Sequence, residues 1–210
     1  MKNLFIFLDA FPPVALPFLM AKITFIFAYL IGSLAFSIIS ARIMGLPDPR
    51  TIGSGNAGAT NMLRTGNKLA AAITLIGDLL KGVLPVGVAC HYSQNPIIIS
   101  AAMLGVFFGH LYPIFFGFKG GKGVATTVGI LIGLHWPLGL TMAGIWLATL
   151  AITRISSLAA LVTAFISPIM TYYWIGTAFA VPVLVIALLQ FWKHRSNIER
   201  LLTNKEPSVR

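Results

Sequence analysis

The chain has almost no acidic charge and a single cysteine. Of its 210 residues only five are Asp or Glu, against 15 Lys or Arg, and charged residues of both signs make up 10%. The lone Cys90 cannot form a disulfide within the chain and indicates no redox chemistry. No group of His, Cys and carboxylate residues has the spacing of metal ligands, so neither a metal site nor another cofactor is expected.

Hydrophobic residues dominate the composition instead. They account for 57% of the chain, and the mean hydropathy is +0.88. Residues 23–41 carry no charge at all, and as a helix they would be about 28 Å long. The hydrocarbon core of a bilayer is about 30 Å thick. This composition excludes a soluble domain and predicts helices that cross a membrane.

Seven apolar segments are expected to be helices, because the bilayer core offers no water to unpaired peptide groups. They are residues 23–41, 69–89, 96–116, 124–134, 137–153, 158–173 and 178–192. The fourth is short and could tilt or lie inside the bundle. The sequence thus predicts an all-α integral membrane protein, a bundle of seven transmembrane helices. Residues 1–21 would be an extramembrane or interfacial extension without a signal cleavage site, residues 22–203 the helical domain, and residues 204–210 a tail.

Basic residues alternate along the predicted loops. Lys and Arg occur after the first, third, fifth and seventh segments, and the three other connections contain neither. Short basic loops remain in the cytoplasm, which predicts a periplasmic N-terminus and a cytoplasmic C-terminus. The net charge of +10 also suits attraction to the anionic head groups of the lipid bilayer. The basic residues are dispersed through short loops, so no nucleic acid partner is expected.

The first of two glycine-rich polar stretches, residues 53–61, reads GSGNAGATN. Glycine lets a backbone approach a ligand closely, and successive N–H groups form concave anion sites. Candidate phosphate-binding residues in and after this stretch are Ser54, Gly55, Asn56, Thr60, Asn61 and Arg64. Arg64 can grip a phosphate through two hydrogen bonds. The stretch lacks the spacing of a Walker loop, and the alternative is that its small residues merely allow close helix packing.

The second stretch, residues 118–123, reads FKGGKG and precedes the fourth apolar segment. It places Gly120, Gly121 and Lys122 at the start of a helix, where backbone N–H groups and the helix dipole favour an anion. Lys119 is interpreted as a head-group or topology charge. His110, upstream, is interpreted as a structural hydrogen-bonding residue. Because both stretches fall in basic loops, a cationic site is predicted at the cytoplasmic face.

Asp78 and Lys81 are three residues apart within the second apolar segment and so share a helix face. Ionisable groups inside a span are costly and usually pair or line a polar cavity. The spacing is compatible with a mutual ion pair and with a role in shaping the site.

Three motifs in order are SGNAGATN at residues 54–61, GHLYPIFFGFKGGKGVAT at residues 109–126 and HRSNIERLL at residues 194–202. They resemble the signature regions of the PlsY family of bacterial membrane acyl-phosphate:glycerol-3-phosphate acyltransferases. The resemblance implies a seven-helix inner-membrane enzyme with its active site facing the cytoplasm. It implies transfer of an acyl group from acyl-phosphate to the sn-1 hydroxyl of glycerol 3-phosphate, which yields lysophosphatidic acid and phosphate and begins phospholipid synthesis. The soluble enzyme that makes acyl-phosphate would be a partner.

The same resemblance assigns roles to individual residues. Those matched as catalytic are Ser54, Lys122, His194 and Asn197, the last two in contact with the glycerol substrate. Those matched as phosphate- or substrate-binding are Arg64 and Ser157, with Ser156 as the adjacent alternative. Ser196 departs from the family, in which this position is often acidic.

The predicted reaction joins two substrates that both carry phosphate, so it needs cations. Arg64, Lys122 and a protonated His194 can supply them. Acyl-phosphate is already activated, so no covalent serine intermediate is required, and the proton acceptor would be His194 or a substrate phosphate. The alternative functions are a transporter of small anions or lipid phosphates, which would place such residues at the bilayer midplane, and a non-catalytic membrane scaffold.

Overall fold

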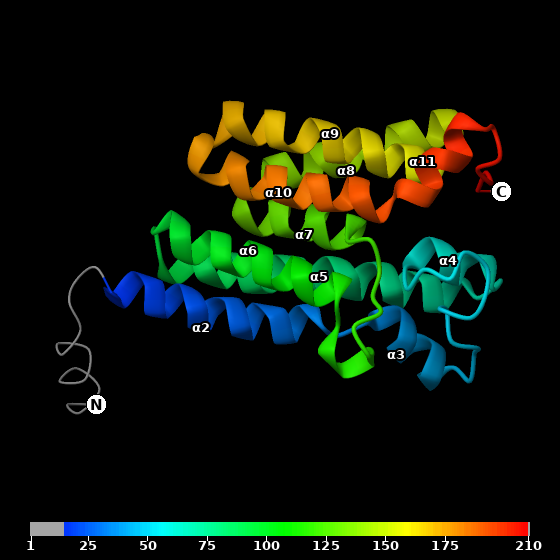
Figure 1. Ribbon diagram of the computed structural model, residues 1–210, viewed down its shortest axis with the longest axis horizontal. Helices are drawn as coiled ribbons and strands as arrows, with labels where there is room; N and C mark the ends of the chain where they lie inside the picture. The colour runs from blue at the N-terminus through cyan, green and yellow to red at the C-terminus, as the bar shows by residue number, and fades with distance from the viewer. Residues whose placement is uncertain (1–14, 210) are drawn as a thin grey trace.

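The apolar segments form a bundle of helices that run roughly along one axis (Figure 1). The computed structural model describes residues 15–209, and each regular element in that range is a helix. In chain order these are α2 (Ala15–Gly32), α3 (Phe36–Ile43), α4 (Ala59–Arg64), α5 (Lys68–Tyr92), α6 (Pro96–Leu111), the 3-10 turn η1 (Ile114–Phe116), α7 (Val124–Leu134), α8 (Trp136–Thr153), α9 (Ser156–Trp174), α10 (Thr177–Lys193) and α11 (Arg195–Leu202).

Five helices in the described part of the chain are long and apolar enough to cross a membrane. They are α2 with α3, α5, α6 with η1, α8 and α9. A sixth is added if α10 and α11, which are bent by 59° at His194, count as one span. The fourth expected segment, α7, has 11 residues, about 16 Å of helix. The chain is therefore a multi-pass membrane protein, in which α7 is shorter than a bilayer is thick.

The first expected span is not continuous, because residues 33–35 separate α2 from α3. The hydroxyl of Ser33 donates to the carbonyl of Tyr29 at 2.8 Å and competes with helical hydrogen bonding. The carbonyl of Leu34 accepts a hydrogen bond from the ammonium of Lys81 at 2.8 Å, while the N–H of Ile38 donates to the carbonyl of Ala35. The break is thus held by a contact with α5, far away in sequence.

Two boundaries, the start of the first segment and the end of the third, also differ from the prediction. α2 begins at Ala15, within the stretch expected to be an extension, and residues 1–14 of that stretch lie outside the described range. α6 ends at Leu111 rather than continuing to residue 116. Pro113 follows, and a proline disfavours helical geometry in the residue before it. The second glycine-rich stretch is therefore reached through η1.

Close helix contacts place α7 directly against α5. A Cβ at Gly129 would lie 3.2 Å from the Cα of Gly82 and would collide with the carbonyl of Leu79. Only residues without side chains allow backbones to approach this closely. The second glycine-rich stretch, which leads into α7, is thereby held over the middle of α5.

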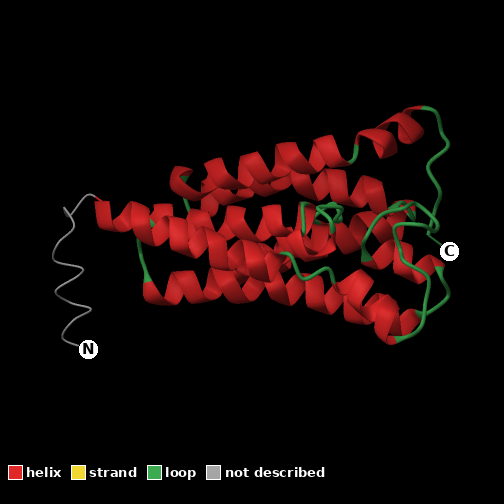
Figure 2. Ribbon diagram, turned by 60° about the horizontal axis from the view of Figure 1, so that its bottom comes forward, coloured by secondary structure: helices red, strands yellow, loops and turns green. Residues whose placement is uncertain are grey.

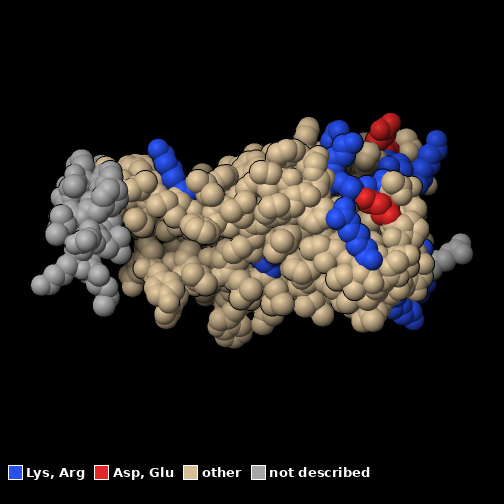
Figure 3. All heavy atoms as spheres, turned by 90° about the horizontal axis from the view of Figure 1, so that it is seen from below, with Lys and Arg blue, Asp and Glu red and all other residues tan. Residues whose placement is uncertain are grey.

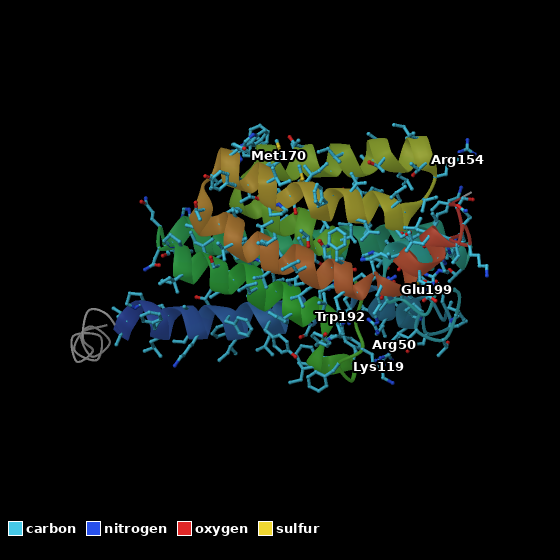
Figure 4. The ribbon with its side chains drawn as sticks, turned by 45° about the horizontal axis from the view of Figure 1, so that its top comes forward. Arg50, Lys119, Arg154, Met170, Trp192 and Glu199 are labelled. Atoms are coloured by element: carbon cyan, nitrogen blue, oxygen red, sulfur yellow. The ribbon has the colours of Figure 1, made fainter. Side chains whose placement is uncertain are left out.

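The polar loops and basic side chains gather at one end of the bundle. Figure 2 shows the longer loops at the end where the described chain finishes, and on the face drawn in Figure 3 most Lys and Arg residues lie there too. Arg50, Lys119 and Arg154 are at this end, and Met170 is at the other (Figure 4). This end holds the site described next.

Candidate active site

The first glycine-rich loop is held in shape by the side chain of Asn61. Its Oδ1 accepts the N–H of Ser54 at 2.9 Å, and its Nδ2 donates to the carbonyls of Pro49 at 2.7 Å and Ile52 at 3.1 Å. Gly53 has a φ of +57°, and a Cβ there would collide with Asn61. Asn61 is buried, so its amide serves the loop and is not free to bind a phosphate.

Two backbone N–H groups of this loop are used within the loop itself. The N–H of Ser54 goes to Asn61, and the N–H of Gly55 goes to the carbonyl of Ile52 at 2.9 Å. A short loop of this kind needs its own hydrogen bonds to keep one shape. The loop can offer side chains to a ligand, because Ser54 is exposed and Asn56 is half-buried.

An ion pair and a backbone contact join this loop to η1. Arg50 Nη2 lies 2.7 Å from Asp48 Oδ2, and Arg50 Nη1 donates to the carbonyl of Phe116 at 2.7 Å. Hydrogen bonding to Arg50 lowers the pKa of Asp48, so the pair stays charged. The segment that leads into the first glycine-rich loop is thereby joined to η1, which precedes the second.

The short helix α4 links the first loop to α9. The hydroxyls of Thr60 and Ser156 are 3.1 Å apart. Arg64, the last residue of α4, is exposed. It lines a cavity of about 320 Å³ together with Thr60, Leu63, Ser208 and Val209. This cavity, with a basic residue in its lining, can receive an anionic group.

The second glycine-rich loop rests on the end of α6. The N–H of Gly120 donates to the carbonyl of Leu111 at 3.3 Å, and the N–H of Gly121 donates to the carbonyl of His110 at 3.2 Å. These two N–H groups are therefore engaged and do not face a ligand. The loop presents the half-buried side chain of Lys122 instead.

Lys122 is the first member of a hydrogen-bonded cluster that joins four segments. Its ammonium donates to Asn197 Oδ1, and Asn197 Nδ2 donates to Glu206 Oε1 at 2.6 Å. The same carboxylate oxygen accepts the hydroxyl of Ser157 at 2.8 Å. Its other oxygen accepts Arg200 Nε at 2.6 Å. The second loop, α9, α11 and the chain beyond α11 meet here.

Electrostatics keep this cluster cationic at neutral pH. Burial, followed by repulsion from Arg200, lowers the pKa of Lys122 to about 8. Although burial opposes it, hydrogen bonds from Asn197, Ser157 and Arg200 lower the pKa of Glu206. The Glu206 carboxylate is paired with Arg200, so the charge of Lys122 is left for a ligand.

His194 lies buried at the bend between α10 and α11. Its Nδ1 is 2.8 Å from the carbonyl of Gln190, which can only accept, so Nδ1 carries a proton. Burial lowers the pKa of His194 to about 4, and the ring is neutral at pH 7. With the ring neutral, its Nε2 is a hydrogen-bond acceptor.

Sequence reasoning missed Glu206. Residues 204–210 were expected to be a simple tail, but the N–H of Val209 donates to the carbonyl of Arg154 at 2.7 Å, and Glu206 bridges Ser157 and Asn197. The available signal was scarcity: Glu206 is one of only five acidic residues in the chain. An acidic residue in so basic a segment indicates an ionic or hydrogen-bonding partner.

The fold and site define a class: a multi-pass membrane protein with a cationic, hydrogen-bonded site at one end of its helices. A family model described as glycerol-3-phosphate acyltransferase matches residues 22–204, and the chain belongs to this family. The chain is accordingly an acyltransferase, which sets aside the transporter and scaffold alternatives. The resemblance to the PlsY family is confirmed.

Curated relatives carry the same description. A glycerol-3-phosphate acyltransferase of Thioalkalivibrio sulfidiphilus is 48% identical over 192 residues, which cover 91% of this chain and 95% of the relative. One of Thiobacillus denitrificans is 50% identical over 187 residues, covering 87% of this chain and 94% of the relative. The similarity thus extends over nearly the whole of each protein.

Two solved structures share the fold. The crystal structure of PlsY, an integral membrane glycerol 3-phosphate acyltransferase, in its glycerol 3-phosphate form has a TM-score of 0.86 at 34% identity and covers 90% of this chain and 96% of that one. The lysophosphatidic acid form has a TM-score of 0.84 at 33% identity, with 90% and 95% covered. The helical arrangement described above is therefore that of an experimentally known enzyme.

Proposed function

We propose that this acyltransferase moves the acyl group of acyl-phosphate to the sn-1 hydroxyl of glycerol 3-phosphate, and so forms lysophosphatidic acid and phosphate. The observation that carries the proposal is the Lys122, Asn197 and Glu206 cluster at the cationic end of the bundle. The glycerol 3-phosphate and lysophosphatidic acid forms of the related PlsY support the acceptor and the product.

Charge balance favours two phosphate-bearing substrates. Arg64 stands in the wall of the small cavity, where its guanidinium can hold a phosphate through two hydrogen bonds. Lys122 keeps its charge for a second anion, because Arg200 balances Glu206. Two cations on separate segments can therefore bring two anions together, which neither could do alone.

The groups around Lys122 orient the acceptor. The hydroxyl of Ser157 and the amide of Asn197 are both fixed by Glu206. We assign to them, with Lys122, the task of holding glycerol 3-phosphate against the acyl donor. Holding two reactants in this way can contribute about 7 to 11 kcal/mol in the best case.

The reaction then needs no covalent intermediate. The acceptor hydroxyl oxygen bonds to the acyl carbonyl carbon, the bond from that carbon to the phosphate oxygen breaks, and phosphate leaves with the electron pair. The hydroxyl proton passes to His194 Nε2 or to a substrate phosphate. Lys122 stabilises the negative charge that develops as the phosphate departs. Ser54 is assigned to substrate contact from the exposed side of the first loop, with Asn56 and Thr60 beside it.

We place the site on the cytoplasmic side of the bacterial inner membrane, with seven spans and a periplasmic N-terminus, because the basic residues lie at the site's end. Maleimide labelling of intact cells tests this orientation. With Cys90 replaced by Ser, a cysteine at exposed Asn204 should be labelled only after the membrane is opened. A cysteine at Tyr92, at the other end of α5, should be labelled directly. The reverse pattern would contradict the orientation.

The reaction is tested with purified protein in lipid vesicles. Palmitoyl-phosphate is supplied with and without glycerol 3-phosphate, and palmitoyl-CoA serves as the comparison donor. Phosphate release that depends on glycerol 3-phosphate and is matched by lysophosphatidic acid supports the proposal. Turnover with palmitoyl-CoA alone would keep the acyltransferase and replace the donor.

A further inference from the structure

A buried ionic cluster lies beneath the site and has no place in the reaction described above. Asp78 and Lys81 of α5 and His110 of α6 are 3%, 2% and 6% exposed. Lys81 Nζ is 2.7 Å and His110 Nδ1 is 3.6 Å from the same oxygen, Asp78 Oδ1. Ionisable groups in a span are costly and mark function more often than stability.

One arm of this cluster reaches the break between α2 and α3. Lys81 Nζ donates to the carbonyl of Leu34 at 2.8 Å and lies 5.9 Å from the centre of the Phe36 ring. A Cβ at Gly77, one turn earlier in α5, would collide with that ring. α5 thus contacts the start of α3, the helix from which the chain continues into the first glycine-rich loop.

The other arm reaches the second glycine-rich loop. His110 Nδ1 lies 3.2 Å from Thr126 Oγ1 in the first turn of α7, and the carbonyl of His110 accepts the N–H of Gly121. A Cβ at Gly121 would collide with His110 Nε2 and would lie 2.6 Å from the carbonyl of Ala57. The His110 ring and the Ala57 carbonyl of the first loop therefore both lie next to the position that a side chain of residue 121 would take.

We infer that Asp78, Lys81 and His110 form a positioning cluster that sets the place of Lys122 relative to the first loop. None of the three touches the groups assigned to the substrates. Their partners are the supports of both loops: Leu34 before α3, and Gly121 and Thr126 on either side of Lys122. The inference rests on the role proposed for Lys122.

A double-mutant cycle tests the coupling. His110→Leu, which removes both ring nitrogens, should lower kcat at least about tenfold and change the KM for glycerol 3-phosphate less than about threefold, because Lys122 acts on charge that develops in the transition state. In a Lys122→Ala background, where there is no ammonium left to place, the same change should cost less than about threefold. His110→Asn, whose amide can replace Nδ1, should recover part of kcat.

Controls separate positioning from folding. Thr171→Val, which changes a buried hydroxyl bonded to Ser167 in α9, should leave kcat unchanged. Gel filtration and thermal melting report the folded fraction of each variant. If His110→Leu does not fold, the cycle is run with Thr126→Val, from which a smaller coupled loss is expected. Equal losses in both backgrounds, or an unchanged kcat in folded His110→Leu, would overturn the inference. Failure of the proposed donor would instead appear in the unmodified protein.

Discussion

The two glycine-rich loops of this enzyme are held in opposite ways. The first is a surface loop shaped by its own side chains, chiefly Asn61, which bonds three backbone groups. The second is fastened by its backbone to the end of α6 and lies on the buried ring of His110. The first loop is therefore tuned by local residues, whereas the second depends on the membrane-embedded core.

This difference teaches which changes each loop tolerates. A loop whose residues 53–55 are exposed can shift when one hydrogen bond is lost, since no packed interior holds that side. A loop pressed against a close-packed interior cannot, because the interior does not yield to an added methyl group. We therefore expect the largest effects in the second loop.

The greatest loss is expected from Lys122→Ala. It removes the cation that faces the transferred group, and kcat/KM should fall about 100-fold, as for other single groups that stabilise transition-state charge. Arg64→Ala, at the exposed end of α4, should cost about tenfold. Phosphate release and labelled lysophosphatidic acid measure both. Near-normal rates in both variants, with the protein still inserted in the membrane, would contradict the proposed site.

Gly121→Ala is expected to lower kcat/KM about 30-fold, because its Cβ would meet His110 and the carbonyl of Ala57. Gly144→Ala in α8 is the matched control, since a Cβ there meets nothing within 4 Å. Kinetics of both variants in lipid vesicles decide the matter. Equal activity of the two would show that the second loop is not fastened as described.

Glu206→Gln should reduce kcat/KM about 20-fold, the effect of weakening hydrogen bonds that involve charge. The variant keeps the size of the side chain but cannot hold Ser157, Asn197 and Arg200 with a carboxylate. Glu199→Gln, at an exposed position of α11, should be silent. A steady-state assay of the pair separates a specific role from general loss of negative charge.

Asn61→Ala should have a smaller effect, about a fivefold rise in the KM for glycerol 3-phosphate, because the first loop relaxes rather than collapses. Asn61→Asp keeps the acceptor for the N–H of Ser54 and loses the donor to Pro49 and Ile52. Its KM should therefore lie between that of the unmodified enzyme and that of Asn61→Ala. A loss larger than that of Gly121→Ala would reverse the comparison.

The smallest effect is one of pH. The pKa of Lys122 is lowered to about 8, so the charged form is lost as pH rises through that value. The kcat/KM, which reports the free enzyme, should be about half its maximum at pH 8 and keep falling above it. Lys122→Arg, which stays protonated, should abolish this decline at a lower maximum. An unchanged profile in the arginine variant would assign the decline to another group.

Much of the fold could be predicted, because membrane helices need long apolar runs. Each of the seven apolar segments contains a helix, although five meet the length and apolarity of a span. The break at residues 33–35 could not be predicted, since the contact that holds it comes from Lys81 of a later helix. Local pattern carries no information on such contacts.

The candidate site divides in the same way. Of the two residues that carry its charge, Lys122 stands in the second glycine-rich stretch and Arg64 follows the first, and both stretches are visible in the sequence. The use of the glycine N–H groups was not predictable, because their partners are carbonyls of α6 and of the loop itself. The role of Glu206 depends on the chain folding back over α9 and α11.

That return of the chain has a consequence for synthesis. Every helix of the bundle precedes Glu206, so the carboxylate that joins Ser157 to Asn197 is among the last parts of the site to leave the ribosome. A chain shortened to end just after α11 would keep the described helices, yet Asn197 and Ser157 would lack the carboxylate that joins them. The hydrogen-bond network around Lys122 is thereby completed only after the helices that carry it are made.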